Sequence, residues 1–333
     1  LEVVLDRSVG PEDYRRDDAM RDAVLEHFRS SVERLVRMGR EAGAEVVLVT
    51  PASNLRDFSP FKAESSPGLD AESAAQAGRL AGSATELLEV GDFERAAALA
   101  DQAFVIDPRN ADLLFLRGRA LLGIGDVAGA RAAFMAARDE DVAPLRALSP
   151  VSRIVTRAAV DHSTGFVDFE AMMADVSTEG IPGDDHFLDH VHPSIDAHRM
   201  LGLAILDELV ETGVASPAPS WSDAAIADIS ERVVASIDEA AHARALANLA
   251  RILSWAGKQD EALTVADRAT EMTRDPHTVF QMLTVLVRDG RTDEALVYAD
   301  EAARLMPDIA DVRKMNGVLL SENGRSAEAL PEL

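Results

Sequence analysis

The stretch Gly91-Asp92-Phe93-Glu94-Arg95-Ala96 opens a pattern that returns along the chain and decides its fold. A glycine recurs 34 residues later, and again in the C-terminal third at spacings of 33 and 34 residues. An alanine stands five residues after each glycine. The glycines are Gly91, Gly125, Gly257, Gly290 and Gly324, and the alanines are Ala96, Ala130, Ala262, Ala295 and Ala329. The period predicts an array of repeated units.

Each repeat is expected to be a pair of helices. Glycine ends the first helix, a small alanine lets the second helix approach it closely, and a proline such as Pro108 or Pro307 stops the second helix. The pattern resembles the tetratricopeptide repeat, although no repeat carries the tryptophan of the full signature. This resemblance implies helical surfaces that bind a protein or peptide partner.

The segments outside the repeats have a different pattern. Residues 19–43 predict an amphipathic helix whose apolar face is formed by Val24, Phe28, Val32, Leu35 and Val36. Residues 44–50 then predict a buried parallel strand. Further along, the sequence predicts a helix over 150–161, a strand over 165–169 and a helix over 194–212. Two such helix-strand steps indicate an α/β domain that is interrupted by repeats.

The sequence therefore predicts an α/β plus all-α fold: a partial flavodoxin-like parallel sheet, an inserted helical repeat unit and a C-terminal repeat array. The expected segments are a first α/β segment (1–66), inserted repeats (67–148), a second α/β segment (149–214), a linker rich in proline and serine (215–221) and C-terminal repeats (222–333).

Four of the eight histidines lie between positions 186 and 198. Among them, Asp189-x-x-His192-Pro193 stands in a loop just ahead of the last predicted helix. This spacing allows the Asp189 carboxylate to accept a hydrogen bond from Nδ1 of His192, which leaves Nε2 to take a proton from a hydroxyl group.

The motif and its strand-loop-helix context resemble the last sequence block of SGNH (GDSL-type) hydrolases. The resemblance implies that His192 is the general base and Asp189 its orienting partner. More narrowly, the chain resembles bacterial proteins in which tetratricopeptide repeats interrupt and follow an SGNH hydrolase-like domain. The expected substrate is an acylated small molecule or glycan, and no cofactor is expected.

Two other interpretations of this segment stay open. Asp189 could simply cap the helix that follows. Alternatively, His186, His190 and His192 with Asp185 or Asp189 could ligate a metal ion, although the surrounding proline and glycine residues favour a loop and we predict no metal site.

Further candidate residues lie beyond the carboxyl end of the first strand, where ligands bind in open α/β sheets. Ser53, Asn54 and Arg56 are predicted to bind substrate, and Arg56 could hold an anionic group. Asn54 could equally be a turn former. Arg146, where the chain returns from the repeats, is a weaker substrate-binding candidate with a salt bridge as its alternative role.

The sequence has no recognisable serine nucleophile. Gly-Asp-Ser, Gly-x-Ser-x-Gly and Gly-x-Asn-Asp elements are all absent from it. Because the chain begins at Leu1 rather than methionine and stops at Leu333 inside a repeat, we expect a fragment that lacks the N-terminal strands of the hydrolase domain. A signal or membrane anchor would then belong to the longer protein, so its location stays open.

Charge excludes other classes of function. The chain has 33 Lys+Arg against 58 Asp+Glu, a formal net charge of −25, which argues against nucleic-acid binding and against docking on anionic membranes. No apolar stretch is long enough to span a bilayer. With no cysteine, thiol chemistry is excluded. The acidity of the repeats suggests a basic partner, or a merely solvated surface.

Two functional hypotheses result. In the first, the complete protein is a serine ester hydrolase or O-acyltransferase whose repeats bind partners. In the second, the α/β domain is non-catalytic and the protein is a repeat scaffold.

Overall fold

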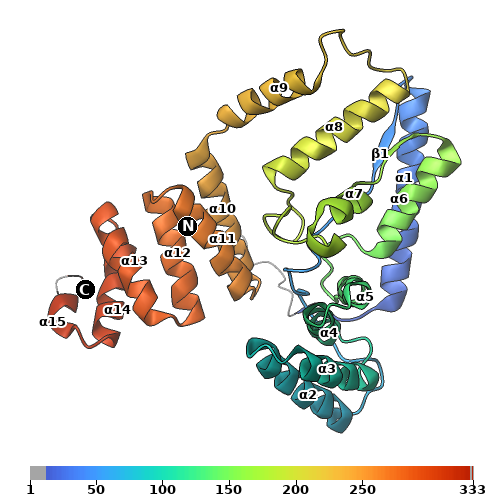
Figure 1. Cartoon of the computed structure of the whole chain (residues 1–333). Coiled ribbons are helices and arrows are strands. Elements are labelled where there is room, and N and C mark those ends of the chain that lie inside the picture. Colours follow the sequence, from blue (N-terminus) through green and yellow to red (C-terminus); the bar gives the residue numbers. More distant parts are fainter. Residues whose placement is uncertain (1–12, 331, 333) are drawn as a thin grey trace. The chain divides into compact units, whose positions relative to one another are not determined.

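In the computed structural model, which describes residues 13–330 and Glu332, the chain is mostly helical (Figure 1). The described residues divide into two compact units, here called the N-terminal unit (residues 13–221) and the C-terminal unit (222–330 and 332). Because each unit has its own packing, each is treated by itself. Leu1 and Leu333, where the sequence led us to expect the ends of a fragment, lie outside the described residues.

Helical hairpins occur where the glycine-alanine pattern predicts them. The first repeat group consists of α2 (Ala71–Glu89), α3 (Phe93–Ile106), α4 (Ala111–Gly123) and α5 (Val127–Asp139). The second repeat group consists of α10 (Glu239–Trp255), α11 (Gln259–Met272), α12 (Pro276–Asp289), α13 (Thr292–Leu305), α14 (Ala310–Glu322) and α15 (Ser326–Ala329). In the C-terminal unit, α9 (Asp223–Ala235) precedes the second group.

The pattern works as the sequence predicts. All five glycines have a positive φ, between 73° and 81°, a conformation that glycine adopts without steric penalty. The five alanines that follow them are buried, none more than 2% exposed. A larger side chain at these positions would push the paired helices apart, since protein interiors are close-packed. The prediction of helical repeats is confirmed.

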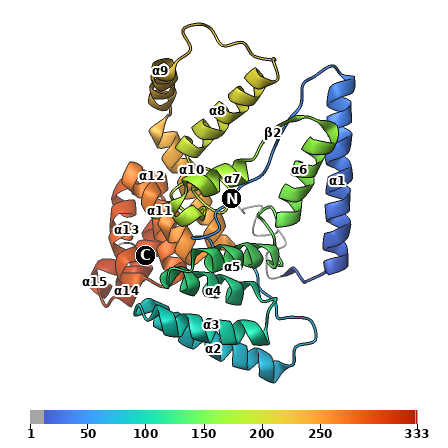
Figure 2. The same cartoon turned by 45° about the vertical axis from the view of Figure 1, so that its right-hand side comes forward.

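The remainder of the N-terminal unit contains a small parallel sheet with helices around it. Its elements are α1 (Asp18–Glu41), β1 (Val47–Val49), α6 (Ser149–His162), β2 (Gly165–Val167), α7 (Phe169–Val176), the 3-10 turn η3 (Thr178–Gly180) and α8 (Ile195–Glu211). Strands β1 and β2 pair in parallel, with Leu48 opposite Phe166. Helix α1 runs beside α6 in both views (Figures 1 and 2).

The predicted parallel pairing of two strands is correct, but the sheet is much smaller than a flavodoxin-like sheet. Within the described residues it has two strands of three residues each. Both strands are shorter than the runs of seven and five residues that the sequence suggested. Hydrogen bonds from Gly165 N to Val46 O and from Thr50 N to Val167 O extend the pairing slightly at each end.

The predicted apolar face of the first helix is partly wrong. Val32 and Val36 are buried, as expected, but Val24 is 57% and Leu35 is 64% exposed. The helix contacts α6 and leaves the rest of its apolar side uncovered within the described residues. The apolar periodicity predicts the helix, but it does not predict how much of the apolar face a neighbouring helix buries.

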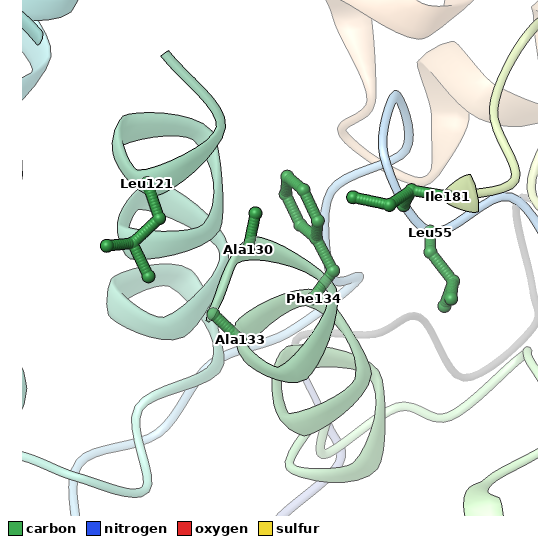
Figure 3. Close-up of a cluster of buried hydrophobic side chains, with 6 residues drawn as sticks. All are labelled: Leu55, Leu121, Ala130, Ala133, Phe134 and Ile181. Carbon is green, nitrogen blue, oxygen red and sulfur yellow. The ribbon is translucent and has the colours of Figure 1, made fainter. Parts of the chain in front are cut away.

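The inserted repeats share a core with the α/β region. Phe134 of α5 packs with Leu55, from the loop after β1, and with Ile181, from the loop after α7 (Figure 3). Charged groups strengthen this junction. Arg138, only 1% exposed, donates to Glu170 of α7 at 3.0 Å and to the Ser149 hydroxyl at 2.6 Å. The first repeat group is therefore built into the N-terminal unit.

No described helix combines the length and the hydropathy that crossing a membrane requires.

Candidate functional site

The predicted dyad lies in a closed loop between α7 and α8. Phe187 is fully buried and forms an isolated antiparallel bridge with Pro193. Leu188 N donates to His192 O at 2.8 Å, and Ser194 N donates to His186 O at 2.8 Å. These backbone bonds fold residues 187–193 back on themselves, so Asp189 and His192 lie at one end of the loop.

Asp189 and His192 form the predicted contact. The Asp189 side chain is fully buried, whereas the His192 side chain is 63% exposed. Oδ2 of Asp189 lies 2.8 Å from Nδ1 of His192. Oδ1 of Asp189 accepts from the backbone N–H groups of Val191 and His192 at 2.8 and 2.7 Å. With a proton on Nδ1, Nε2 of His192 is left as the acceptor, which is the state that a general base requires.

Burial would raise the pKa of the Asp189 carboxyl, but its neighbours outweigh burial and hold this pKa well below its ordinary value. The strongest opposing effect comes from the His190 imidazole, whose Nδ1 lies 3.4 Å from Oδ2, followed by the backbone and side-chain donors of His192. Asp189 is therefore ionised at neutral pH and can orient the imidazole of His192. It does not cap the following helix, because the Ser194 hydroxyl does so by accepting from Ala197 N.

His190, which the sequence offered as a possible metal ligand, lies on the other side of Asp189 from His192. Its side chain is 13% exposed, and its Nδ1 lies 3.4 Å from Oδ2 of Asp189. The ring packs against Phe58 and Phe61, with centroid distances of 5.1 and 4.9 Å. A signal was present in the sequence, since two aromatic residues follow the first strand within the same loop, but spacing alone could not bring them to His190.

Three predicted substrate-binding residues lie in the loop after β1, and two of them are engaged with protein groups. Asn54 is fully buried, donates from Nδ2 to Asp184 at 2.8 Å and accepts from the Asp57 N–H at 3.0 Å. Arg56 lies 2.9 Å from Asp57 and 3.3 Å from Asp185. Ser53 is 4% exposed, and its hydroxyl has no hydrogen-bond partner within the described residues. Their role in substrate binding stays a prediction.

The fourth predicted residue, Arg146, is buried and holds the same loop. Its Nη1 donates to the carbonyl oxygens of Asn54 and Phe58 at 2.9 and 2.8 Å, and Nη2 lies 3.9 Å from Asp141. Burial raises the pKa of Asp141, although backbone N–H donors from Phe61 and others oppose the shift. The geometry gives Arg146 a bracing position, and substrate contact stays a prediction.

The structure gives no grouping that completes a metal or nucleophile site among the residues it describes. No three His, Asp or Glu side chains there converge as metal ligands. Among the same residues, no serine hydroxyl makes a hydrogen bond to His192. Nearby, the Asp168 carboxylate caps α7 by accepting from Ala171 N and also accepts from the Thr50 hydroxyl.

Comparison with known proteins supports the repeats. The sequence pattern of the tetratricopeptide repeat family matches residues 82–142, which cover most of the first repeat group. No curated protein sequence matches the chain significantly.

Several solved structures show similar helical arrays at low identity. One is YrrB, a tetratricopeptide repeat protein with an unusual peptide-binding site, at 17% identity, covering 76% of this chain and 80% of that chain, with a TM-score of 0.22. Another is the TPR2AB domain of yeast Sti1 in a complex with pHSP90, at 11% identity, 78% and 88% coverage and a TM-score of 0.26. A third is TTC0263, a thermophilic repeat protein of Thermus thermophilus, at 15% identity, 76% and 98% coverage and a TM-score of 0.21. These likenesses are weak, and it is the family match over residues 82–142 that shows tetratricopeptide repeats in this mostly helical chain.

Proposed function

We propose that the protein is a repeat-based interaction module that binds a protein or peptide partner through its helical hairpins. The observation that carries this proposal is the repeat architecture itself, which the family match supports in the first group and the glycine-alanine hairpins support in both. Stacked hairpins expose an extended surface that suits a peptide or a protein segment.

The charge of the second repeat group indicates which partner chemistry suits it. Its first helices, α10, α12 and α14, carry five basic and four acidic residues. Its second helices, α11, α13 and α15, carry two basic and nine acidic residues. The acidity of this array is therefore concentrated on the second helices, and the first helices are close to neutral in a strongly acidic chain.

Arg244 is paired with Asp275, but the other four cations of the first helices are available. Within the described residues, Arg251, Arg288, Arg313 and Lys314 make no hydrogen bond or ion pair through their side chains, and the last three are exposed. By contrast, Arg304 on the second helix α13 donates to a backbone carbonyl. A partner with carboxylates facing the first helices would neutralise these cations, so we infer an acidic peptide or acidic protein segment.

Fluorescence anisotropy with labelled acidic and basic peptides of equal length tests this proposal. The acidic peptide is expected to bind despite the net charge of −25, and increasing salt is expected to weaken it. Lys314→Glu on α14 should weaken binding roughly fivefold, whereas the matched reversal Arg304→Glu on α13 should change it little. Preference for the basic peptide, or equal effects of the two reversals, would overturn the assignment.

A second candidate function rests on the contact of 2.8 Å between Asp189 and His192. This pair has the geometry of the base and orienter of an SGNH-type serine ester hydrolase or O-acyltransferase. The nucleophile would have to be a serine that does not contact His192 in the described residues. In this candidate the N-terminal unit acts on an acylated small molecule or glycan, and the repeats recruit the partner that carries it.

Hydrolysis of p-nitrophenyl acetate by the longest available form of the protein tests the second candidate. The candidate predicts activity that His192→Ala reduces by roughly a hundredfold or more, the usual contribution of a positioned general base. The matched control is His198→Ala, because His198 is an exposed histidine in the following helix. Activity that survives His192→Ala would exclude this candidate and leave the interaction module.

A further inference from the structure

We infer that His190 is a positioning residue that keeps the buried Asp189 carboxylate charged and aimed at His192. The inference rests on the second candidate function, because it deepens the same Asp189–His192 pair. Its geometric basis is that two imidazole groups approach one carboxylate oxygen, Oδ2 of Asp189, at 2.8 Å from His192 and 3.4 Å from His190.

The two imidazoles differ in burial, which gives them different roles. His192 is 63% exposed, so solvent and substrate can reach it, whereas the His190 ring is enclosed and cannot act on a substrate directly. His190 therefore approaches Asp189 from the protein side and His192 from the solvent side. A group that is shielded in this way acts through the carboxylate.

Aromatic packing fixes the position of the His190 ring. Phe58 lies tilted against it at an interplanar angle of 42°, and Phe61 meets it nearly edge-on at 79°. The backbone is fixed as well, since the His190 carbonyl accepts from Asn54 N at 3.1 Å. With both ring and backbone held, Nδ1 of His190 has little freedom to turn away from Asp189.

The loop that carries these contacts is in turn braced. Arg146 donates to the carbonyl oxygens of Asn54 and Phe58, and its guanidinium lies 5.8 Å from the Phe58 ring centroid. Asp141 accepts from the backbone N–H of Phe61 at 2.7 Å. Residues at the exit of the first repeat group thus hold the aromatic pair that holds His190.

The imidazole of His190, with Nδ1 3.4 Å from Oδ2, lies where the buried carboxylate lacks solvent. The Asp189 side chain has no exposed surface, and burial of a carboxylate favours its neutral form. A protonated carboxyl would no longer select the Nδ1–H tautomer of His192. The charged or titratable groups around His190 are Asp189, His192, Arg146 beyond Phe58, and Asp141 beyond Phe61. Of these, only Asp189 and His192 approach its ring directly in the described structure.

The test uses NMR of the whole chain with 15N-labelled histidine and follows the Nδ1–H signal of His192 as the pH is lowered. His190→Phe keeps an aromatic ring between Phe58 and Phe61 but removes the nitrogen. We expect the acid midpoint at which the Asp189–His192 bond is lost to rise by about one pH unit or more, because the buried carboxylate loses the imidazole nitrogen that approaches it. The matched control His198→Phe should leave the midpoint unchanged.

His190→Asn separates this effect from simple packing, because its side-chain N–H can occupy the position of Nδ1. We expect it to restore the midpoint to within a few tenths of a pH unit of the native chain. If His190→Phe does not fold, the acid midpoints of His190→Asn and His190→Ala give the same comparison of a side chain with and without an N–H group. An unchanged midpoint in the variant without a donor would overturn the inference. The measurement requires no turnover. A shifted midpoint in a protein without esterase activity would therefore support the positioning role of His190 and reject only the second candidate function.

Discussion

The two repeat groups use the same glycine-alanine hairpin but begin their second helices differently. In the first group, Asp92 and Asp126 follow the glycine and cap α3 and α5 through the backbone N–H groups of Arg95 and Gly129. In the second group the same position holds a basic residue without a side-chain cap: Lys258, Arg291 and Arg325. A cation at a helix N-terminus also opposes the helix dipole. The first group is thus locally better capped.

The groups also differ in their neighbours. Phe134 and Arg138 of the first group are buried against the α/β region, so host residues complete its core and its polar contacts. The second group packs mainly helix against helix within its own unit. An inserted repeat is stabilised by its host, and we expect its stability to depend on contacts that lie outside the repeat pattern.

Arg138→Met should give the largest effect. It leaves Glu170 and the Ser149 hydroxyl without their buried partner and is expected to destabilise the first group by about 3 kcal/mol. Hydrogen exchange resolved by helix should show faster exchange in α2–α5 and unchanged exchange in α10–α15. The control Arg304→Met removes an exposed arginine of the second group and should change neither. If α2–α5 were equally protected from hydrogen exchange in the native chain and in Arg138→Met, the first group would not depend on the α/β region for its stability.

Gly118→Ala should come next. A Cβ at this position of α4 would lie 2.7 Å from the ring of Phe134, which is 1% exposed and cannot move aside. Overpacking of this kind is expected to cost about 2 kcal/mol in urea denaturation. Gly82→Ala is the matched control, because its Cβ would meet nothing within 4 Å and should stabilise α2 by about 0.5 kcal/mol. A neutral Gly118→Ala would show that the first group is less tightly packed than described.

Exchanging the caps tests the local difference between the groups. Asp126→Ala should cost about 1 kcal/mol, since Gly129 N loses its acceptor. Arg291→Asp should raise the stability of α13 by less than a full cap contributes, because the ion pair of Arg291 with Glu294 at 2.6 Å is lost. Both are measured by thermal unfolding. A destabilising Arg291→Asp would mean that the ion pair matters more than the cap.

Acid should loosen the junction of α1 with the first group by a small amount. The hydrogen bonds and charge of Arg109 lower the pKa of Asp18 to about 2. Because the folded pKa is below the ordinary 3.8, this contribution is complete above about pH 4 and is lost as the pH falls towards 2. The Asp18 side chain is 43% exposed, so solvent screening should keep the effect below about 1 kcal/mol. Asp18→Asn should remove this acid dependence from hydrogen exchange in the first turn of α1, and an unchanged pH profile would contradict the assignment.

Much of the architecture could be predicted from local patterns. The hairpins follow from a glycine that must adopt a positive φ and an alanine that must fit between helices, and both requirements are visible in the sequence. The contact of Asp189 with His192 follows from a spacing of three residues in a loop. The predicted helix over 194–212 was correct within one residue at each end, and the Ser194 cap marks its start.

Other features depend on residues that are distant in the sequence. The exposure of Leu35 was not predictable, because it depends on how much of α1 its neighbour α6 covers. The enclosure of His190 by Phe58 and Phe61 joins positions about 130 residues apart, with the inserted repeats between them. The bracing by Arg146 is of the same kind, since its partners lie 88 and 92 residues away.

The sequence by itself determined the helical repeats, the parallel step from helix to strand and the pairing of Asp189 with His192, because each depends on short-range geometry. Only the tertiary structure decided that the first repeat group is fused to the α/β region, that the sheet has two short strands in the described residues, and that His190 is held behind Asp189. Those outcomes depend on which surfaces pack together. The burial, hydrogen bonds and charge of a side chain then depend on partners that are distant in the sequence, and no local pattern predicts them.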